Sequence, residues 1–336
     1  MSGSRERTSV GHASVAVIGA GVAGLAAALA LTERGARVRV YERAAALGEG
    51  ACSWQAGGML APWCERDGAG PELTAQGEEA LAWWPRHHPA TVQRGTLAVA
   101  HARDRGELEK LARRSGAGQW LDGEGIAALE PALAGRFEHG LWFAREAHLD
   151  PREALHSLAA ALGARGVPIQ FHAEVDAAEL VADAVIDCRG LAARDALPDL
   201  RGVRGETLVL RTAEVAFRRP LRLLHPRHPL YLVPRADGRL LLGATVVESG
   251  HAGPVTARAA MELLNAAWAL HPALAEAAIV ELGVGVRPAL PDHLPCLLTQ
   301  GRITRFNGLY RHGFLLAPWY AQALARQLFP TQEARA

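Results

Sequence analysis

The sequence predicts an α/β protein with a discontinuous Rossmann-like domain and an inserted domain built on a mixed or antiparallel β-sheet. Near the N-terminus, a buried strand, a glycine-rich turn and an apolar helix follow one another over residues 14–33. A second segment of helix and strand covers residues 150–190, and the pattern changes to closely spaced strands after Gly205. Because α/β segments flank β-rich ones, the first domain should be assembled from separate parts of the chain.

The first element is a strand that ends in a glycine-rich turn. Residues 14–18 are mostly apolar, as in a buried parallel strand, and lead into Gly19-x-Gly21-x-x-Gly24. Gly19 permits a tight turn, Gly21 lets the backbone approach a pyrophosphate, and Gly24 allows close packing of helix on strand. The helix over residues 25–33 offers its N-terminal N–H groups to phosphates. This arrangement predicts a dinucleotide site, the alternative being an ordinary strand–turn–helix unit.

The second strand, residues 37–42, ends in Glu42. Its carboxylate is expected to accept hydrogen bonds from the ribose hydroxyls of the dinucleotide and to repel a 2′-phosphate. A looser triplet, Gly123-x-Gly125-x-x-Ala128, has neither a buried strand before it nor a strand with a terminal acid after it. The chain is therefore predicted to bind one dinucleotide.

The remaining elements are expected in the following order. Small residues and glycines dominate residues 48–58, which permits close approach of the backbone to a ligand. One helix should begin with Asp150 as N-cap and Pro151 in its first turn. The helices are expected at 72–84, 105–114, 124–131, 150–164, 257–271 and from the 311–318 segment to 328. The strands are expected at 96–100, 140–143, 167–171, 182–190, 206–211, 230–234, 239–244, 279–287 and 303–309.

These elements predict a division into two domains. The nucleotide domain comprises residues 14–84, 147–203 and 283–330, and the substrate domain residues 85–146 and 204–282. Residues 1–13 are expected to form a flexible tail.

Composition excludes several classes of function. The 36 basic and 35 acidic residues give a net charge of +1 at pH 7, so no field attracts nucleic acid or an anionic membrane. No apolar run is long enough to cross a membrane, and the first 13 residues lack the apolar core of a signal peptide. The four cysteines have no metal-ligand spacing, which predicts no metal site and suits reduced thiols in the cytoplasm. Lys110 is the only lysine, which argues against Schiff-base chemistry.

A single dinucleotide site is compatible with two kinds of enzyme. The chain is either a nicotinamide-dependent dehydrogenase or a flavoprotein whose flavin is reduced by the substrate itself. The glycine-rich residues 48–58 favour the flavin, because an isoalloxazine needs an extended path beyond the pyrophosphate.

Six motifs carry a resemblance to a known family. They are residues 17–24 (VIGAGVAG), 56–60 (AGGML), 231–235 (YLVPR), 243–245 (GAT), 285–288 (GVRP) and 311–318 (RHGFLLAP). In this order the chain resembles the D-amino-acid oxidase superfamily of FAD-dependent oxidoreductases and, within it, the glycine oxidases of thiamine biosynthesis. The resemblance spans nearly the whole chain, and the last four motifs are more specific than the first.

The resemblance implies FAD as the hydride acceptor. Covalent attachment, as in sarcosine oxidase, is not expected, because Cys296 lies several residues beyond the corresponding position. Val175 resembles the position that meets the adenine, although residues 174–183 are shorter than in the family and lack the expected hairpin. The FAD-binding residues implied by the motifs are Gly19, Gly21, Val22, Ala23, Gly24, Glu42, Arg43, Cys52, Ser53, Gly57, Gly58, Met59, Val175, Gly190, Arg311, His312, Gly313, Phe314 and Leu315.

For the substrate, the family places an arginine on the carboxylate and a tyrosine beside it. Arg287 matches, and it lies in an otherwise apolar strand, where a buried guanidinium requires an anionic partner. The alternative for Arg287 is an internal salt bridge. Tyr231 is expected to donate its hydroxyl to the same carboxylate, the alternative being a core tyrosine. Arg311 is a second basic candidate near the flavin, the alternative being a surface loop.

The implied reaction is the oxidation of a small amino acid. Its amine loses a proton, the Cα hydride passes to flavin N5, and dioxygen reoxidises the flavin to give hydrogen peroxide. With glycine the imine is hydrolysed to glyoxylate and ammonia or is used directly in thiazole synthesis.

Related substrates remain open, namely sarcosine, proline and small D-amino acids. A non-catalytic flavin-binding module predicts bound FAD that no amino acid reduces, and a nicotinamide-dependent dehydrogenase predicts a colourless protein. The sequence is compatible with a homo-oligomer and does not fix the oligomeric state.

Overall fold

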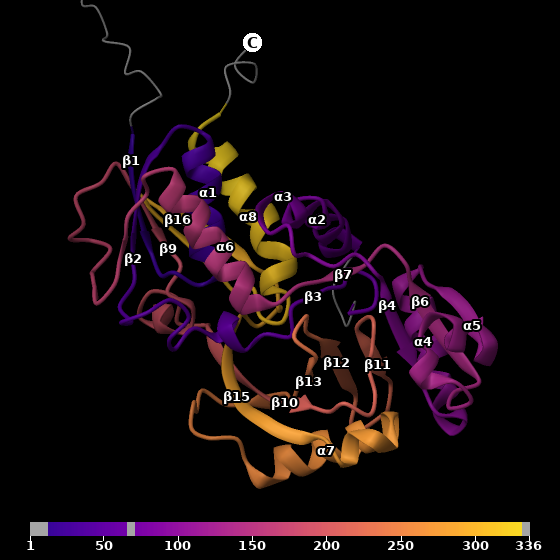
Figure 1. Cartoon of the computed structure of the whole chain (residues 1–336). Coiled ribbons are helices and arrows are strands. Elements are labelled where there is room, and N and C mark those ends of the chain that lie inside the picture. The colour runs from indigo at the N-terminus through magenta and orange to yellow at the C-terminus, as the bar shows by residue number, and fades with distance from the viewer. Residues whose placement is uncertain (1–12, 66–70, 331–336) are drawn as a thin grey trace, which may run out of the picture.

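The computed structural model describes residues 13–65 and 71–330, so nearly all of the expected N-terminal tail lies outside the described residues. Two large β-sheets are present, one around the N-terminal strand β1 (Ser14–Ile18) and the other around the long strand β10 (Arg201–Arg211) (Figure 1). The first has the topology of an α/β domain and the second is β-rich. The expected fold class is confirmed.

The first sheet is built mainly from parallel strands. Its order is β16-β17-β9-β1-β2-β8, and among the described strands only the pair β16 and β17 is antiparallel. Val15 and Val17 are buried, and β1 pairs with β2 on one side and β9 on the other, which places the N-terminal strand in the middle. The strands are β1 (Ser14–Ile18), β2 (Arg37–Tyr41), β8 (Ile169–Gln170), β9 (Ala184–Asp187), β16 (Cys296–Gln300) and β17 (Ile303–Asn307).

Three helices cover one face of this sheet: α1 (Val22–Glu33), α6 (Pro151–Ala164) and α8 (Gly313–Leu328). The side chains of Leu25 and Leu29 are fully buried, and α1 packs between α6 and α8 (Figure 1). Asp150 caps α6 as predicted, because its Oδ1 accepts hydrogen bonds from the N–H groups of Arg152 (2.8 Å) and Glu153 (3.4 Å). None of the described helices is long and apolar enough to cross a membrane.

The opposite face of the first sheet is covered by an irregular segment. Val175, Ala177 and Leu180 pack against Ile18 and Val185. All residues between β8 and β9 are described, and none of them forms a strand. The predicted absence of a hairpin in residues 174–183 is therefore confirmed.

The second sheet is mixed, which is one of the two arrangements predicted. Its order is β14-β10-β13-β12-β11-β4-β6-β5, with β15 paired along the other edge of β10, and the only parallel pair in the described sheet is β11 with β4. The strands are β4 (Thr96–Val99), β5 (Gln119–Asp122), β6 (His139–Phe143), β10 (Arg201–Arg211), β11 (Leu221–Leu223), β12 (Leu230–Pro234), β13 (Arg239–Gly243), β14 (Val247–Glu248) and β15 (Ala278–Ala289).

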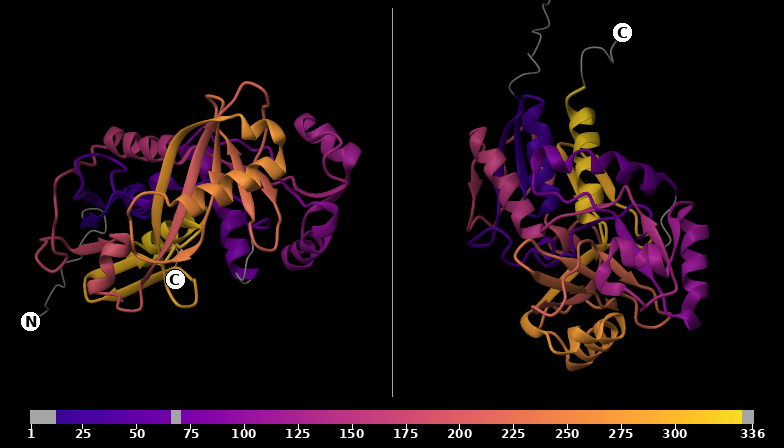
Figure 2. Two further views of the ribbon diagram at one scale, coloured as in Figure 1. Left: turned by 90° about the horizontal axis from the view of Figure 1, so that it is seen from below. Right: turned by 45° about the vertical axis from the view of Figure 1, so that its right-hand side comes forward.

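Shorter elements complete the second sheet and join the two parts. The helix α7 (Ala257–Leu270) packs on β10, β12 and β13, and α4 (Arg105–Ser115) and α5 (Gly123–Leu129) lie by β6 at the far end (Figure 2). The helices α2 (Pro71–Leu81) and α3 (Trp84–His87) lie near α8 and α6 respectively. Two short strands, β3 (Met59–Leu60) and β7 (Ala147–His148), pair with each other between the large sheets.

Several elements differ from the predictions. The strands β3, β7, β11, β14 and β16 were not expected, and β10 begins at Arg201 instead of at residue 206. Residues 119–122, judged a poor buried strand, form the edge strand β5, whose Trp120 is 44% exposed. An edge strand needs no buried face, so hydrophobic alternation does not reveal it. The strand β15 extends from residue 278 to 289 and pairs with β10 over its whole length. The proposed domain boundary at residues 282 and 283 therefore falls inside one strand, and the division into domains stays a prediction.

Candidate active site

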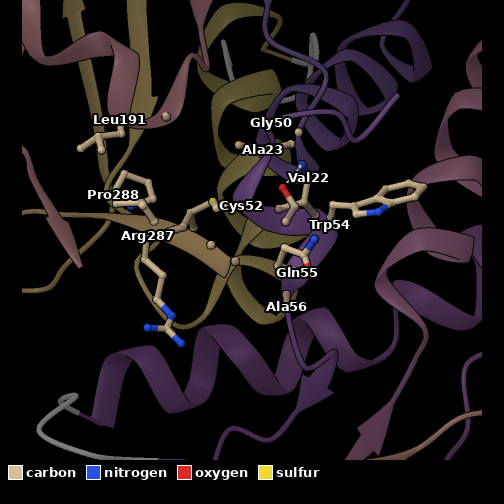
Figure 3. A pocket seen from close by; sticks show the side chains of 18 of the residues that line it. Val22, Ala23, Gly50, Cys52, Trp54, Gln55, Ala56, Leu191, Arg287 and Pro288 are labelled. Carbon is tan, nitrogen blue, oxygen red and sulfur yellow. Dashed lines mark hydrogen bonds between the residues drawn. The ribbon is translucent and has the colours of Figure 1, made fainter. Parts of the chain in front are cut away.

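A cavity of about 1340 Å³ lies where the two sheets meet. Its walls come from the carboxyl ends of β1, β2, β9 and β17 and from residues of β12 and β15. Carboxyl ends of parallel strands are where α/β sheets bind ligands. Figure 3 shows Val22, Ala23 and Gly50 on one side of Cys52, with Arg287 and Pro288 on the other side. The cavity thus joins the glycine-rich turn to the second sheet.

At one end of the cavity, Glu42 is fixed directly after β2. Its Oε2 accepts a hydrogen bond from the N–H of Ala20 (2.7 Å) and its Oε1 from the N–H of Ala44 (3.0 Å). Gly19 has a φ of 101°, and a Cβ there would lie 2.7 Å from the carbonyl oxygen of Cys188. Only glycine meets both conditions. The turn therefore brings the acid of β2 against the start of α1, as a dinucleotide site requires.

The N-terminus of α1 opens into the same cavity. Gly21 occupies the N-cap position and supplies no side-chain cap. The hydroxyl of Ser53, from the glycine-rich segment, accepts a hydrogen bond from the N–H of Val22 (3.2 Å). A Cβ on Gly24 would lie 1.8 Å from the carbonyl oxygen of Gly19. Gly24 therefore has the packing role predicted for it and lies behind the cavity wall.

Every residue from 48 to 58 lines the cavity. Its 3-10 helix, Cys52–Gln55, packs against β15, and the chain then passes Tyr231. A Cβ on Gly57 would lie 2.7 Å from the Tyr231 ring. Gly58 has a φ of 77°, and a Cβ there would lie 2.1 Å from the carbonyl oxygen of Leu149. The glycines of this segment thus allow the backbone to run directly beside a cavity-lining tyrosine.

Arg287 reaches the cavity from β15 (Figure 3). Its Nη1 donates a hydrogen bond to the carbonyl oxygen of Thr245 (3.2 Å). No ion pair to Arg287 occurs within residues 13–65 and 71–330. The alternative of an internal salt bridge is not seen in this part of the chain. A half-buried cation that faces a cavity calls for an anionic ligand.

Tyr231 lines the cavity beside this guanidinium. Burial raises the pKa of its hydroxyl, and the positive charge of Arg287 partly opposes this. The phenol is therefore neutral at physiological pH and can donate a hydrogen bond. Arg311, which follows β17, also lines the cavity, and its charge acts on the Tyr231 hydroxyl in the same sense.

Most of the predicted site residues come together in this cavity. The predicted residues that line it are Gly19, Gly21, Val22, Ala23, Glu42, Arg43, Cys52, Ser53, Gly57, Gly58, Met59, Val175, Gly190, Tyr231, Arg287, Arg311, Gly313 and Phe314.

Three predicted cofactor-binding residues do not line the cavity. Gly24 packs against Gly19, whereas His312 and Leu315 line a small recess beside α2. Phe314 faces the cavity, and one residue further along the helix turns the side chain by about 100°. Cys296 lies on β16 and is not among the cavity-lining residues.

Several cavity residues were not predicted. Arg222 interrupts an apolar strand just as Arg287 does, so the same signal could have identified it. Its side chain donates a hydrogen bond to the carbonyl oxygen of Cys64. Other cavity-lining residues that were not predicted include Gln55, Glu65, Leu191, Thr207 and Val246.

A buried carboxyl group supports the chain beside Glu65. Oε1 of Glu146 accepts hydrogen bonds from the N–H groups of Trp63 (3.0 Å) and Cys64 (2.7 Å). The side chain is fully buried, and burial raises its pKa to about 8 despite these hydrogen bonds. Glu146 is therefore mostly protonated at neutral pH.

The protonation of Glu146 predicts a pH dependence of stability. The unfolded chain loses this proton near the ordinary pKa of 4.5, whereas the folded protein keeps it until about 8. The free energy of unfolding should therefore fall as the pH rises from 4.5 to about 8. Glu146→Gln, neutral at every pH, should lack this part of the fall, as measured by urea unfolding. The exposed Glu138→Gln is the control. Equal pH dependence in all three proteins would contradict the prediction.

Residues 14–327 match the model of the DAO family, described as FAD dependent oxidoreductase. This chain belongs to that family.

Individual relatives agree with this assignment. Over 319 residues the chain is 52% identical to a Rhizobium etli protein assigned as the thiamine biosynthesis oxidoreductase ThiO. The aligned region covers 95% of this chain and 97% of the relative. It is 31% identical over 296 residues to the D-amino-acid oxidase of Streptomyces coelicolor, covering 82% of this chain and 83% of the relative. The crystal structure of glycine oxidase from Geobacillus kaustophilus superposes with a TM-score of 0.81 at 25% identity and covers 94% of each chain. The predicted resemblance is confirmed.

The described residues fit the cofactor of this family. A turn that only glycine can form, a helix N-terminus and Glu42 lie together at one end of the cavity. The glycine-rich backbone leads from there to Tyr231 and Arg287. FAD is thus the cofactor of the enzyme, and its individual contacts stay predictions.

Proposed function

We propose that this FAD-dependent oxidoreductase oxidises glycine to supply thiamine biosynthesis. The observation that carries the proposal is the guanidinium of Arg287, which faces the cavity beside Tyr231 and has no carboxylate partner in the described residues. Such a pair suits the carboxylate of a small zwitterion. The identity of 52% with the Rhizobium etli protein supports a role in the thiamine pathway.

In this proposal the protein orients the amino acid and FAD supplies the redox chemistry. Arg287 binds the carboxylate through its N–H groups, and the Tyr231 hydroxyl donates a further hydrogen bond to it. A bound FAD would supply the acceptor for the hydride of the substrate Cα and the route of the electrons to dioxygen. The net reaction converts glycine, dioxygen and water into glyoxylate, ammonia and hydrogen peroxide. The carboxylate contacts fix the direction in which the Cα–H bond points.

Small D-amino acids form a second candidate class of substrate. The 31% identity with the Streptomyces coelicolor D-amino-acid oxidase favours them. They would use the same carboxylate contacts and differ from glycine in the space needed at Cα. Non-covalent FAD, a cytoplasmic location and a homo-oligomeric state stay predictions from the sequence.

Spectroscopy and turnover test the proposal together. The purified protein should show the flavin absorbance bands, and anaerobic glycine should bleach them. Peroxide production is then compared for glycine, sarcosine, D-alanine and D-proline. Turnover of a bulkier amino acid without turnover of glycine would contradict the glycine assignment. A flavin that none of the four amino acids reduces would contradict the amino-acid oxidase itself.

The Tyr231→Phe variant tests the second carboxylate contact. The substitution removes one hydroxyl donor and keeps the ring against Gly57. We expect KM for glycine to rise about tenfold to a hundredfold, since one hydrogen bond to a charged group is lost. Steady-state kinetics measures the change. The Tyr41→Phe variant, at the end of β2, is the control for loss of a tyrosine hydroxyl elsewhere in the cavity wall. Equal kinetics for Tyr231→Phe and wild type would show that the Tyr231 hydroxyl does not bind the substrate carboxylate.

A further inference from the structure

The side chain of Arg287 is fixed by contacts with the backbone of Gly205 and Thr245. Its guanidinium lies against the backbone of Gly205 on the neighbouring strand β10, where a Cβ would come within 2.1 Å of Nη2. The hydrogen bond to the carbonyl oxygen of Thr245 fixes one edge of the group. The position of that carbonyl therefore decides which way the remaining N–H groups point.

Thr245 is in turn fixed by Glu206. The Thr245 hydroxyl donates to Oε2 of Glu206 (2.8 Å) and accepts from its N–H (2.9 Å). The N–H of Thr245 donates to the carbonyl oxygen of Glu206 (3.3 Å). Neither side chain is among the groups that line the cavity, although Gly205, Thr207, Ala244 and Val246 are. The two residues thus form a layer directly behind the wall.

The carboxylate of Glu206 is fully buried, and both of its oxygens accept hydrogen bonds. Its Oε1 accepts hydrogen bonds from Nη2 of Arg204 (2.8 Å) and from the N–H of Thr256 (2.9 Å). Burial alone would raise the pKa of Glu206, but these hydrogen bonds and the charge of Arg204 lower it. Arg204 also donates to the carbonyl oxygens of His251, Gly253 and Pro254, and so ties down the chain beside Ala252 in the cavity wall.

Stability alone does not explain a buried ion pair of this kind, because apolar residues of similar volume often stabilise a fold at least as well. We propose that Glu206 and Thr245 are positioning residues, which orient Arg287 for the substrate carboxylate through the Thr245 carbonyl. This inference rests on the proposed function. It gives a role to the motif Gly243-Ala244-Thr245, which the substrate contacts leave unexplained.

The Thr245→Val variant tests the inference, because valine keeps the shape and removes the hydroxyl. We expect KM for glycine and the Kd of acetate, a non-reactive carboxylate, each to rise about tenfold, as for loss of a well-oriented hydrogen bond to a charged group. The kcat at saturating glycine should change by less than about twofold, because binding and not hydride transfer is weakened. Acetate binding to the holoenzyme is measured by calorimetry. Thr245→Ser keeps the hydroxyl and should restore both values.

Three further variants distinguish the outcomes. Thr304→Val removes a buried hydroxyl that pairs with Thr299 in the first sheet (3.0 Å) and should leave acetate binding unchanged. Arg287→Gln should weaken acetate binding more than Thr245→Val does. If Arg287→Gln weakens it and Thr245→Val does not, the positioning role is wrong and the proposed function stands. If Arg287→Gln has no effect, both are wrong. Glu206→Gln, which should act in the same direction, replaces Thr245→Val if the latter does not fold.

Discussion

Replacing Arg287 with Gln is expected to lower kcat/KM for glycine by about two to three orders of magnitude. The guanidinium lines the cavity and has no carboxylate partner in the described residues, and glutamine offers the substrate neither its charge nor its paired N–H groups. FAD should remain bound, because the glycine-rich turn and Glu42 lie at the other end of the cavity. Most of the loss should therefore appear in KM, while the flavin spectrum is retained.

Steady-state kinetics and the ratio of flavin to protein absorbance measure both parts of this result. Arg211→Gln is the matched control, because Arg211 is exposed at the end of β10 and should be replaceable without effect. Wild-type kinetics in Arg287→Gln would show that the substrate carboxylate binds elsewhere. Loss of flavin together with activity would show that Arg287 supports the cofactor instead.

Gly24→Ala is expected to abolish stable FAD binding and to lower the free energy of unfolding by about 3 kcal/mol or more. The added Cβ would lie 1.8 Å from the carbonyl oxygen of Gly19, which belongs to the turn itself. The helix α1 can relieve this overlap only by moving away from β1. That movement would also pull its N-terminus away from the position that phosphates require.

Urea unfolding and the flavin content of the purified protein test the Gly24 prediction. Gly163→Ala in α6 is the control, since Gly163 is exposed and a Cβ there would meet no atom within 4 Å. This variant should keep full flavin content and be stabilised by about 0.5–1 kcal/mol, because alanine favours the helix. A Gly24→Ala protein with normal flavin content would mean that helix and strand need not pack so closely.

The parts of the fold that depend on neighbouring residues could be predicted from the sequence. The strand, turn and helix of residues 14–33 and the cap at Asp150 are local patterns, and the structure confirms them. The pairing of β15 with β10 joins residues more than 60 positions apart, as in Arg211 and Ala278. No local signal contains that partner, so the full length of β15 could not be foreseen.

The candidate site shows the same limit. In Arg287 a charge interrupts an apolar strand, and Arg222 carries the same signal. Glu206 carries no such signal, because Arg204, Gly205 and Thr207 surround it in the sequence of β10. The motif match also predicted that His312 and Leu315 bind the cofactor. In the structure these two residues, at the start of α8, line the recess beside α2 instead. Sequence identifies which residues are unusual, whereas the direction of each side chain depends on the helix or strand that bears it.

The place of β17 in the first sheet has a consequence for biosynthesis. This strand lies next to β9, and α8, which follows it, packs against α1 from the beginning of the chain. A ribosome-bound chain that has been synthesised only as far as residue 302 has neither of these elements. The coenzyme pocket therefore cannot be completed before α8 has been made, and flavin capture follows the synthesis of that helix.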